Sequence, residues 1–201
     1  AALFPQVYSV TITDLHVKGK VKGGIHSAGL IGGAISGDPT ITLNHVWVST
    51  EVNCSSTHAG GIIGHSADAN VNMNDVLFDG KVNTNNADNS YIGCIIGWSG
   101  SGGRWNINRV YSHPSARPEA KKYGSVYITM VMLSLGTNDR SFTITSTEWG
   151  DWGVNHYNKT NQSEVVSLMN GKEAGTWQLV NGNAVPVMQT TEKYLTAAQL
   201  V

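Results

Sequence analysis

Carboxylates in this sequence are the first residues to test for catalysis. Asp75 and Asp79 stand four residues apart, so their carboxyl groups could approach the separation of about 5–9.5 Å that glycosidases use. The alternative is that both are solvated partners of Arg109 and nearby lysines. We favour the alternative, because the 14 acidic residues form no recurrent close pair. The sequence also lacks Gly-x-Ser-x-Gly, His-Glu-x-x-His and phosphate-loop motifs, so we assign no catalytic residue.

Histidines offer a second kind of chemistry. They stand at equivalent places around a recurring glycine element: His26, His58 and Tyr91 before it, and Gly33, His65 and Trp98 after it. His58 and His65 could converge on a metal, but no acidic or cysteine third ligand has a matching spacing. We interpret them as surface or corner histidines and predict neither a metal nor a cofactor.

Aromatic residues give the strongest functional signal, because several are expected to point outward beside polar side chains. The candidate ligand-binding residues are Trp47, Tyr111, Tyr91, Trp98, Trp105 and Arg109. Flat aromatic faces beside Asn, Asp and Arg suit sugar rings, and exposed apolar patches often mark interaction sites. The alternative is that loops or a neighbouring domain cover Trp47 and Tyr111.

The elements that position these residues are repeats. A Gly-apolar-apolar-Gly element closes at Gly32, Gly64 and Gly97, 32 and 33 residues apart. An apolar series precedes it in each repeat and begins at Ile12, Leu43 and Met73, with weaker copies at Ile107 and Ile144. Two series with one period and a fixed relative phase indicate a repeat architecture.

Each repeat is predicted to contain short strands rather than helices. Segments such as Val46-Trp47-Val48 alternate with period 2, and no repeat holds an amphipathic segment of helical length. We therefore predict an all-β fold, a short parallel β-helix of about four to five coils with terminal caps. A β-sandwich is the alternative fold.

Stacking the repeats in register gives specific columns. Ile12, Leu43, Met73, Ile107 and Ile144 form an inward column, and the next positions hold Thr13, Asn44, Asn74, Asn108 and Thr145. Stacked Asn side chains can form a hydrogen-bond ladder. The columns Asp14, His45, Asp75, Arg109 and Lys20, Glu51, Lys81 alternate in charge, as neighbouring strands favour.

The domain organisation follows from where the repeat begins and ends. Residues 1–9 are predicted as an N-terminal cap, residues 10–149 as the β-helix and residues 150–201 as a C-terminal cap in one structural domain. Within the last segment, Asn161 and the following residues indicate a capped short helix, and Asn181-Gly182 indicates a hairpin turn. Cys54 and Cys94 are interpreted as two separate thiols.

Composition excludes several partners. The net charge is −1 and only 13% of the residues are charged, so no basic surface points to nucleic acid or to an anionic membrane. No apolar run reaches the length of a transmembrane helix, so we expect no membrane insertion. Apolar residues still make up 40% of the chain, enough for a folded core.

The Gly-apolar-apolar-Gly element, followed by a polar turn and a strand rich in Ile and Val, resembles the GLUG repeat of bacterial surface proteins. The resemblance covers three repeats in roughly residues 10–112. It implies an exported β-solenoid and no particular activity. GLUG repeats also occur in adhesin-like proteins.

These observations lead to one preferred function and two alternatives. We expect a non-enzymatic binding or adhesion module at the bacterial surface or outside the cell. Its partner would be a glycan or another host or microbial surface ligand, and other surface-protein domains are possible partners. The first alternative is a β-helical polysaccharide lyase or hydrolase, or a tailspike-like fragment. The second is a structural spacer.

Overall fold

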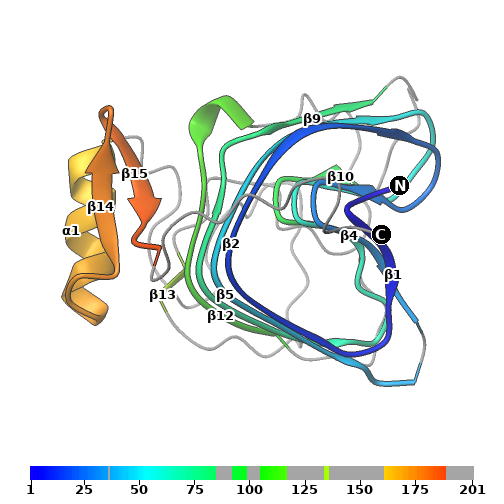
Figure 1. Cartoon of the computed structure of the whole chain (residues 1–201), viewed down its shortest axis with the longest axis horizontal. Helices are drawn as coiled ribbons and strands as arrows, with labels where there is room; N and C mark the ends of the chain where they lie inside the picture. The colour runs from blue at the N-terminus through cyan, green and yellow to red at the C-terminus, as the bar shows by residue number, and fades with distance from the viewer. Residues whose placement is uncertain (36, 85–91, 99–104, 117–133, 136–160, 189–201) are drawn as a thin grey trace, which may run out of the picture.

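The computed structural model describes residues 1–35, 37–84, 92–98, 105–116, 134–135 and 161–188, and they form a parallel β-solenoid with a lateral appendage (Figure 1). The first sheet contains β1 (Phe4–Val7), β4 (Ile31–Ala34), β7 (Ile63–His65) and β11 (Ile96–Trp98). The second contains β3 (Ser27–Ala28), β6 (Ala59–Gly60) and β10 (Ile92–Gly93). The third contains β2 (Val10–Gly23), β5 (Thr40–Cys54), β8 (Asn70–Phe78) and β12 (Trp105–Ser112).

Each coil contributes one strand or strand pair to every sheet. β1, β2 and β3 make the first coil, β4, β5 and β6 the second, and β7, β8, β9 (Lys81–Thr84) and β10 the third. β11 and β12 begin a fourth coil, and β13 (Ser134–Leu135) pairs antiparallel with β12. The predicted parallel β-helix is therefore confirmed. The strands wind in coils that pair in parallel and do not form the two facing sheets of a β-sandwich. The copy at Ile144 lies outside the described residues.

The predicted register is also confirmed. Ile12 pairs with Leu43, Leu43 with Met73, and Met73 with Ile107, so one inward column runs through four coils. The inner residues of the second and third coils are fully buried in one core. Cys54 and Cys94 lie in this core, and no disulfide joins them.

A bend shared by the strands of the third sheet explains the spacing of three residues in Ile12-x-x-Leu15. Strict alternation would turn Leu15 outward, and one residue in the left-handed region of each strand returns the next residue to the core while the strands stay paired one to one. That residue has φ near +50° in all four coils: Asp14 54°, His45 51°, Asp75 55° and Arg109 51°. The bend therefore stacks four charged or titratable side chains in one column.

Asparagine side chains form the predicted ladder beside this column. Asn74 donates from Nδ2 to Oδ1 of Asn44 at 3.0 Å, and Asn108 donates to Oδ1 of Asn74 at 3.4 Å. On the next outward column, Asn106 donates to Asn72 at 2.6 Å. These bonds repeat the strand register in the side chains.

Glycines of the Gly-apolar-apolar-Gly element lie where neighbouring coils approach most closely. A Cβ on Gly61 would lie 1.9 Å from the carbonyl oxygen of Cys94, and one on Gly64 would lie 2.6 Å from that of Gly32. The two apolar residues between such glycines, for example Ile62 and Ile63, are fully buried. In the first two repeats the element is thus a tight corner with no room for a side chain at either glycine, whereas the third repeat has Cys94 at the first of these positions.

The two terminal segments lie elsewhere than predicted. The N-terminal segment contributes β1, which pairs in parallel with β4 as part of the first coil. The described part of the C-terminal segment, residues 161–188, forms α1 (Gln162–Lys172) and the hairpin β14 (Trp177–Val180) and β15 (Asn183–Pro186). This lateral unit packs beside the third sheet, outside the coil, rather than over the last coil (Figure 1). A short 3-10 helix, Pro114–Ala116, follows β12.

Candidate functional site

The outward aromatic column lies under the lateral unit. Side chains of both parts form a second core, here called the lateral core, made of Leu77, Tyr111, Val165, Met169, Trp177, Ala184 and Val185, with Trp47 packed against it. Tyr111 is fully buried, and Gln162 donates from Nε2 to its hydroxyl at 3.0 Å. Burial raises the pKa of Tyr111. The expectation that Tyr111 is exposed is therefore wrong: it points out of the coil, but the lateral unit covers it.

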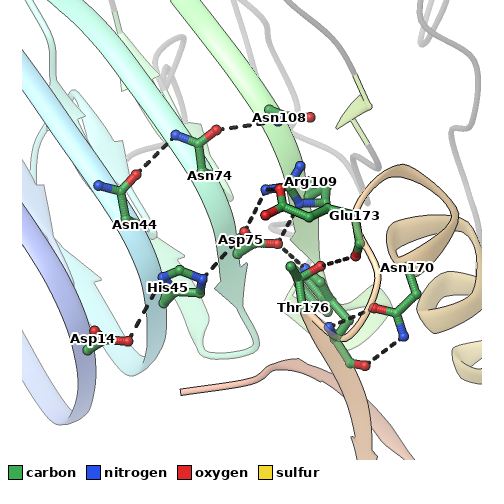
Figure 2. Close-up of polar contacts among 11 residues, drawn as sticks. Asp14, Asn44, His45, Asn74, Asp75, Asn108, Arg109, Asn170, Glu173 and Thr176 are labelled. Atoms are coloured by element: carbon green, nitrogen blue, oxygen red, sulfur yellow. Dashed lines mark hydrogen bonds and ion pairs between the residues drawn. The ribbon is translucent and has the colours of Figure 1, made fainter. Parts of the chain in front are cut away.

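Arg109 is buried as well, in a polar network between the solenoid and the lateral unit (Figure 2). Its Nε and Nη2 donate to the two carboxylate oxygens of Asp75 at 2.7 and 2.8 Å. Its Nη2 also lies 2.8 Å from a carboxylate oxygen of Glu173, which follows α1. The hydrogen bond to Asp75 raises the pKa of Arg109. The guanidinium is thus buried within the protein. Arg109 therefore presents no exposed surface for the ligand-binding role that was expected of it.

The lateral unit is shaped to meet this network. Trp177 donates from Nε1 to Asp75 Oδ1 at 2.8 Å. Its backbone is fixed by Asn170, whose side chain accepts from Trp177 N–H and donates to Trp177 C=O, each at 2.9 Å. Thr176 donates from Oγ1 to the Glu173 carbonyl oxygen at 3.0 Å (Figure 2). These bonds hold the indole in the lateral core and direct its N–H at the solenoid.

Asp75 is therefore a structural acid. It is 1% exposed, and its carboxylate accepts three hydrogen bonds from Arg109 and Trp177. His45 completes the column, with ring nitrogens 3.7 Å from Asp75 and 3.9 Å from Asp14. A general acid or base must reach its substrate, and this carboxylate is enclosed by its partners. The arrangement suits docking of the lateral unit.

Asp79, the second acid considered for catalysis, has a separate environment. Ser49 donates from Oγ to Asp79 Oδ1 at 2.6 Å, and His16 Nε2 lies 3.0 Å from Ser49 Oγ. A serine nucleophile needs its proton directed at the histidine and the acid behind the histidine. Here the serine stands between the two, so its proton is directed at the acid. The hydrogen bonds that link Asp79, Ser49 and His16 fix the His16 ring, which stacks on Trp47 with ring centroids 3.8 Å apart.

A second group of rings gathers at the corner around the first sheet. This ring cluster consists of His26, His58, His65 and Trp98, all partly buried. His65 is stacked between His26 at 4.4 Å and Trp98 at 4.5 Å, measured between ring centroids. His58 meets all three rings edge to face at 5.2–5.4 Å. The cluster joins the two sequence columns that flank the glycine element.

Gly33 makes this arrangement possible. It pairs with His65, which pairs with Trp98, so these positions form one column. The His26 ring lies 3.5 Å from the place of a Gly33 Cβ. His26, from the neighbouring column, therefore fills the position that a larger side chain at Gly33 would occupy. Its backbone and that of His58 are both left-handed, with φ of 55° and 61°.

The imidazoles of the ring cluster are uncharged at neutral pH. Burial, with a smaller contribution from the neighbouring histidines, lowers the pKa of His58 and of His65 to about 4. The pKa of His26 is lowered by burial and by the N-terminal amine. Within the described ranges, no group of three or more His, Cys, Asp or Glu side chains could hold a metal ion.

The structure describes the side chains of two of the four remaining predicted residues. Trp47 and Trp98 are partly exposed and each stacks on a histidine. Tyr91 lies outside the described residues, and Trp105 begins β12. Neither His16 nor His26 is among the ligand-binding residues predicted from the sequence. The signal for them was their position one coil before an aromatic residue or beside a glycine.

Comparisons with protein-family models, curated proteins and solved structures find no match to this chain. Within the part of the chain that the structure describes, no helix is long and apolar enough to cross a membrane.

Proposed function

We propose that this chain is a non-catalytic binding module of an exported bacterial surface protein and that its ring cluster binds a neutral glycan. The observation that carries the proposal is the row His26–His65–Trp98 with His58 at its side, a partly exposed and uncharged aromatic surface. The in-phase resemblance to GLUG repeats supports the surface location. The rigid coil beneath holds the rings at fixed spacing.

The chemistry of the ring cluster suits a sugar. Pyranose rings offer apolar C–H faces and hydroxyl groups, and they bind where flat apolar surface lies beside hydrogen-bonding atoms. Indole and imidazole rings provide both, because each has a flat body and polar ring nitrogens. Neutral imidazoles bring no charge that would favour an acidic glycan. Each such site is weak, so repeated display on a surface would raise the overall affinity.

The two acidic sites support a binding role over the lyase or hydrolase alternative. Asp75 is enclosed by Arg109 and Trp177, and Asp79 accepts a hydrogen bond from Ser49. Asp75 is 1% exposed, so it cannot form an open catalytic pair with Asp79.

A glycan array with the purified chain tests this proposal. We expect binding to one class of neutral glycan, reduced at least tenfold by Trp98→Ala and largely retained by Trp98→Phe, which keeps a flat ring. Tyr111→Phe is the matched control, since its ring lies in the lateral core. Circular dichroism of each variant verifies the fold. An array without reproducible binding, or equal binding by Trp98→Ala and the unmodified chain, would overturn the proposal and favour the spacer alternative.

A further inference from the structure

We infer that Asn181 is a site of spontaneous deamidation, in which its side chain cyclises onto the backbone nitrogen of Gly182 and releases ammonia. The sequence contains a second Asn-Gly pair, Asn170-Gly171, which the fold protects from the same reaction. The inference concerns the lateral unit, and it does not depend on the ring cluster or on glycan binding.

The reaction needs only water and a backbone that can bring two atoms together. The Gly182 nitrogen attacks Cγ of Asn181, so that an N–Cγ bond forms and the Cγ–Nδ2 bond breaks. The side-chain nitrogen takes the backbone proton and leaves as ammonia. Water then opens the resulting cyclic imide at either carbonyl, which gives aspartate or isoaspartate. Because glycine has no Cβ, an Asn-Gly pair offers little steric hindrance to this attack.

Asn181 stands at the exposed tip of the β14–β15 hairpin (Figure 1). It forms a two-residue turn with Gly182 between the paired residues Val180 and Asn183, and the two turn residues have φ of 50° and 79°. Both φ values are positive, as in a type I′ turn. Gly182 lies between the last paired residues, so its N–H takes no part in the strand ladder. Within the residues that the structure describes, no hydrogen bond holds the Asn181 side chain.

Asn170 is held at both ends of its amide. Its Oδ1 accepts from the Trp177 N–H and its Nδ2 donates to the Trp177 C=O, each at 2.9 Å. The attacking nitrogen is also fixed, because Gly171 lies within α1, where backbone N–H groups bond to the carbonyl four residues earlier. Steric space does not separate the two pairs, since a Cβ on either glycine would meet nothing within 4 Å.

The two sites also differ in what must open before the reaction. Cyclisation at Asn181 requires the turn to leave its left-handed conformation, and exposed loop tips open at low free energy. Freeing Asn170 releases the backbone of Trp177, which is 2% exposed in the lateral core. That opening disrupts the packing of the lateral unit on the solenoid. We therefore expect the amide of Asn181 to be lost much faster than that of Asn170.

Deamidation should loosen the hairpin. Isoaspartate adds one carbon to the backbone of the turn and a carboxylate to its tip. A longer turn no longer matches the geometry that pairs Val180 with Asn183 and Leu179 with Ala184. Ala184 belongs to the lateral core, so the change reaches the contact between the hairpin and the solenoid.

The test incubates the full chain at neutral pH in heavy-oxygen water, which labels each carboxylate that the reaction creates. Peptide mapping by mass spectrometry follows the label at Asn181 and Asn170, and electron-transfer fragmentation identifies isoaspartate. A parallel sample in guanidinium chloride measures the same two sites in the unfolded chain. The control variant is Asn181→Gly, which keeps a residue that accepts positive φ and removes the amide.

We expect the folded chain to incorporate label at Asn181 at least tenfold faster than at Asn170, and the two rates to become similar in guanidinium chloride. Hydrogen exchange in β14 and β15 should be faster after incubation than before, with β5 and β8 unchanged. The incubated Asn181→Gly chain should keep the slow exchange of its hairpin.

Three results would overturn the inference. The first is equal labelling of the two asparagines in the folded chain. The second is a rate ratio that stays the same in guanidinium chloride, since the fold would then not be the cause. The third is no label at Asn181 after a time in which the unfolded chain has reacted at both sites. Labelling at Asn181 with unchanged exchange in β14 and β15 would overturn the loosening of the hairpin.

Discussion

The ring cluster should make the fold sensitive to acid between about pH 6.5 and pH 4. His58 and His65 have pKa values of about 4 in the folded chain, against an ordinary value of about 6.5 in the unfolded chain. As the pH falls through this window, the unfolded chain takes up protons that the folded chain does not. The free energy of unfolding therefore decreases with falling pH, and the loss is complete once the pH is below the folded pKa.

The structure gives the size of this effect. The difference between the folded and unfolded pKa values corresponds to about 3 kcal/mol for each histidine. Both rings are partly exposed, so solvent screening reduces the value to roughly 2 kcal/mol each, or about 4 kcal/mol together. Coulomb repulsion has the same order: two charges at the 5.4 Å between the His58 and His65 centroids repel by about 3 kcal/mol at an effective dielectric constant of about 20.

Urea unfolding at pH 7, 6, 5 and 4 measures the change, and NMR titration of the histidine ring protons reports the two pKa values directly. The control is the double variant His58→Asn/His65→Phe. Asn tolerates the left-handed backbone of His58, and Phe keeps a ring between His26 and Trp98. The free energy of unfolding of this double variant should vary by about 4 kcal/mol less than that of the unmodified chain over the same pH range. Histidine pKa values near 6.5, or the same pH profile in the variant, would refute the reasoning.

Two further pairs of variants test the packing. Arg109→Met should destabilise the chain by about 3–5 kcal/mol in urea unfolding, because it leaves the buried Asp75 carboxylate without its cation. Adding Asp75→Asn should recover part of this loss, and a double variant less stable than the single one would show that the charge pair is not the cause. Gly61→Ala should cost about 3 kcal/mol or more in thermal unfolding, because its Cβ would lie 1.9 Å from the Cys94 carbonyl oxygen. Gly33→Ala, with its nearest contact at 3.5 Å, should cost under about 1 kcal/mol, and equal losses in the two would contradict the close-approach explanation.

The repeat could be recognised in the sequence because residues one period apart come into contact in a solenoid. Residues one period apart, such as Asn44 and Asn74, become neighbours on adjacent strands and bond to each other. The strand register, the inward columns and the asparagine ladder all follow from this one rule. The same rule predicted the alternation of Lys20, Glu51 and Lys81.

Only part of the ring cluster could be predicted from the sequence. The sequence placed His26 and His58 in one column and His65 and Trp98 in another, with Gly33 at the start of the second. Whether two columns meet depends on how sharply the chain bends at the corner between them, and the apolar pattern does not encode that angle. The structure shows the bend bringing His26 over Gly33, and this contact stacks the two columns.

The position of the lateral unit was decided by tertiary structure alone. Asp75 and Trp177 are 102 residues apart, and Tyr111 and Gln162 are 51 residues apart, and neither separation belongs to the period of the repeat. The sequence pattern around an outward Tyr in a repeat is the same whether water or another segment lies against it. The sequence by itself determined which residues leave the coil, because alternation along a strand is local. Only the fold decided which of them stay at the surface, because covering them depends on contacts between segments that share no periodicity.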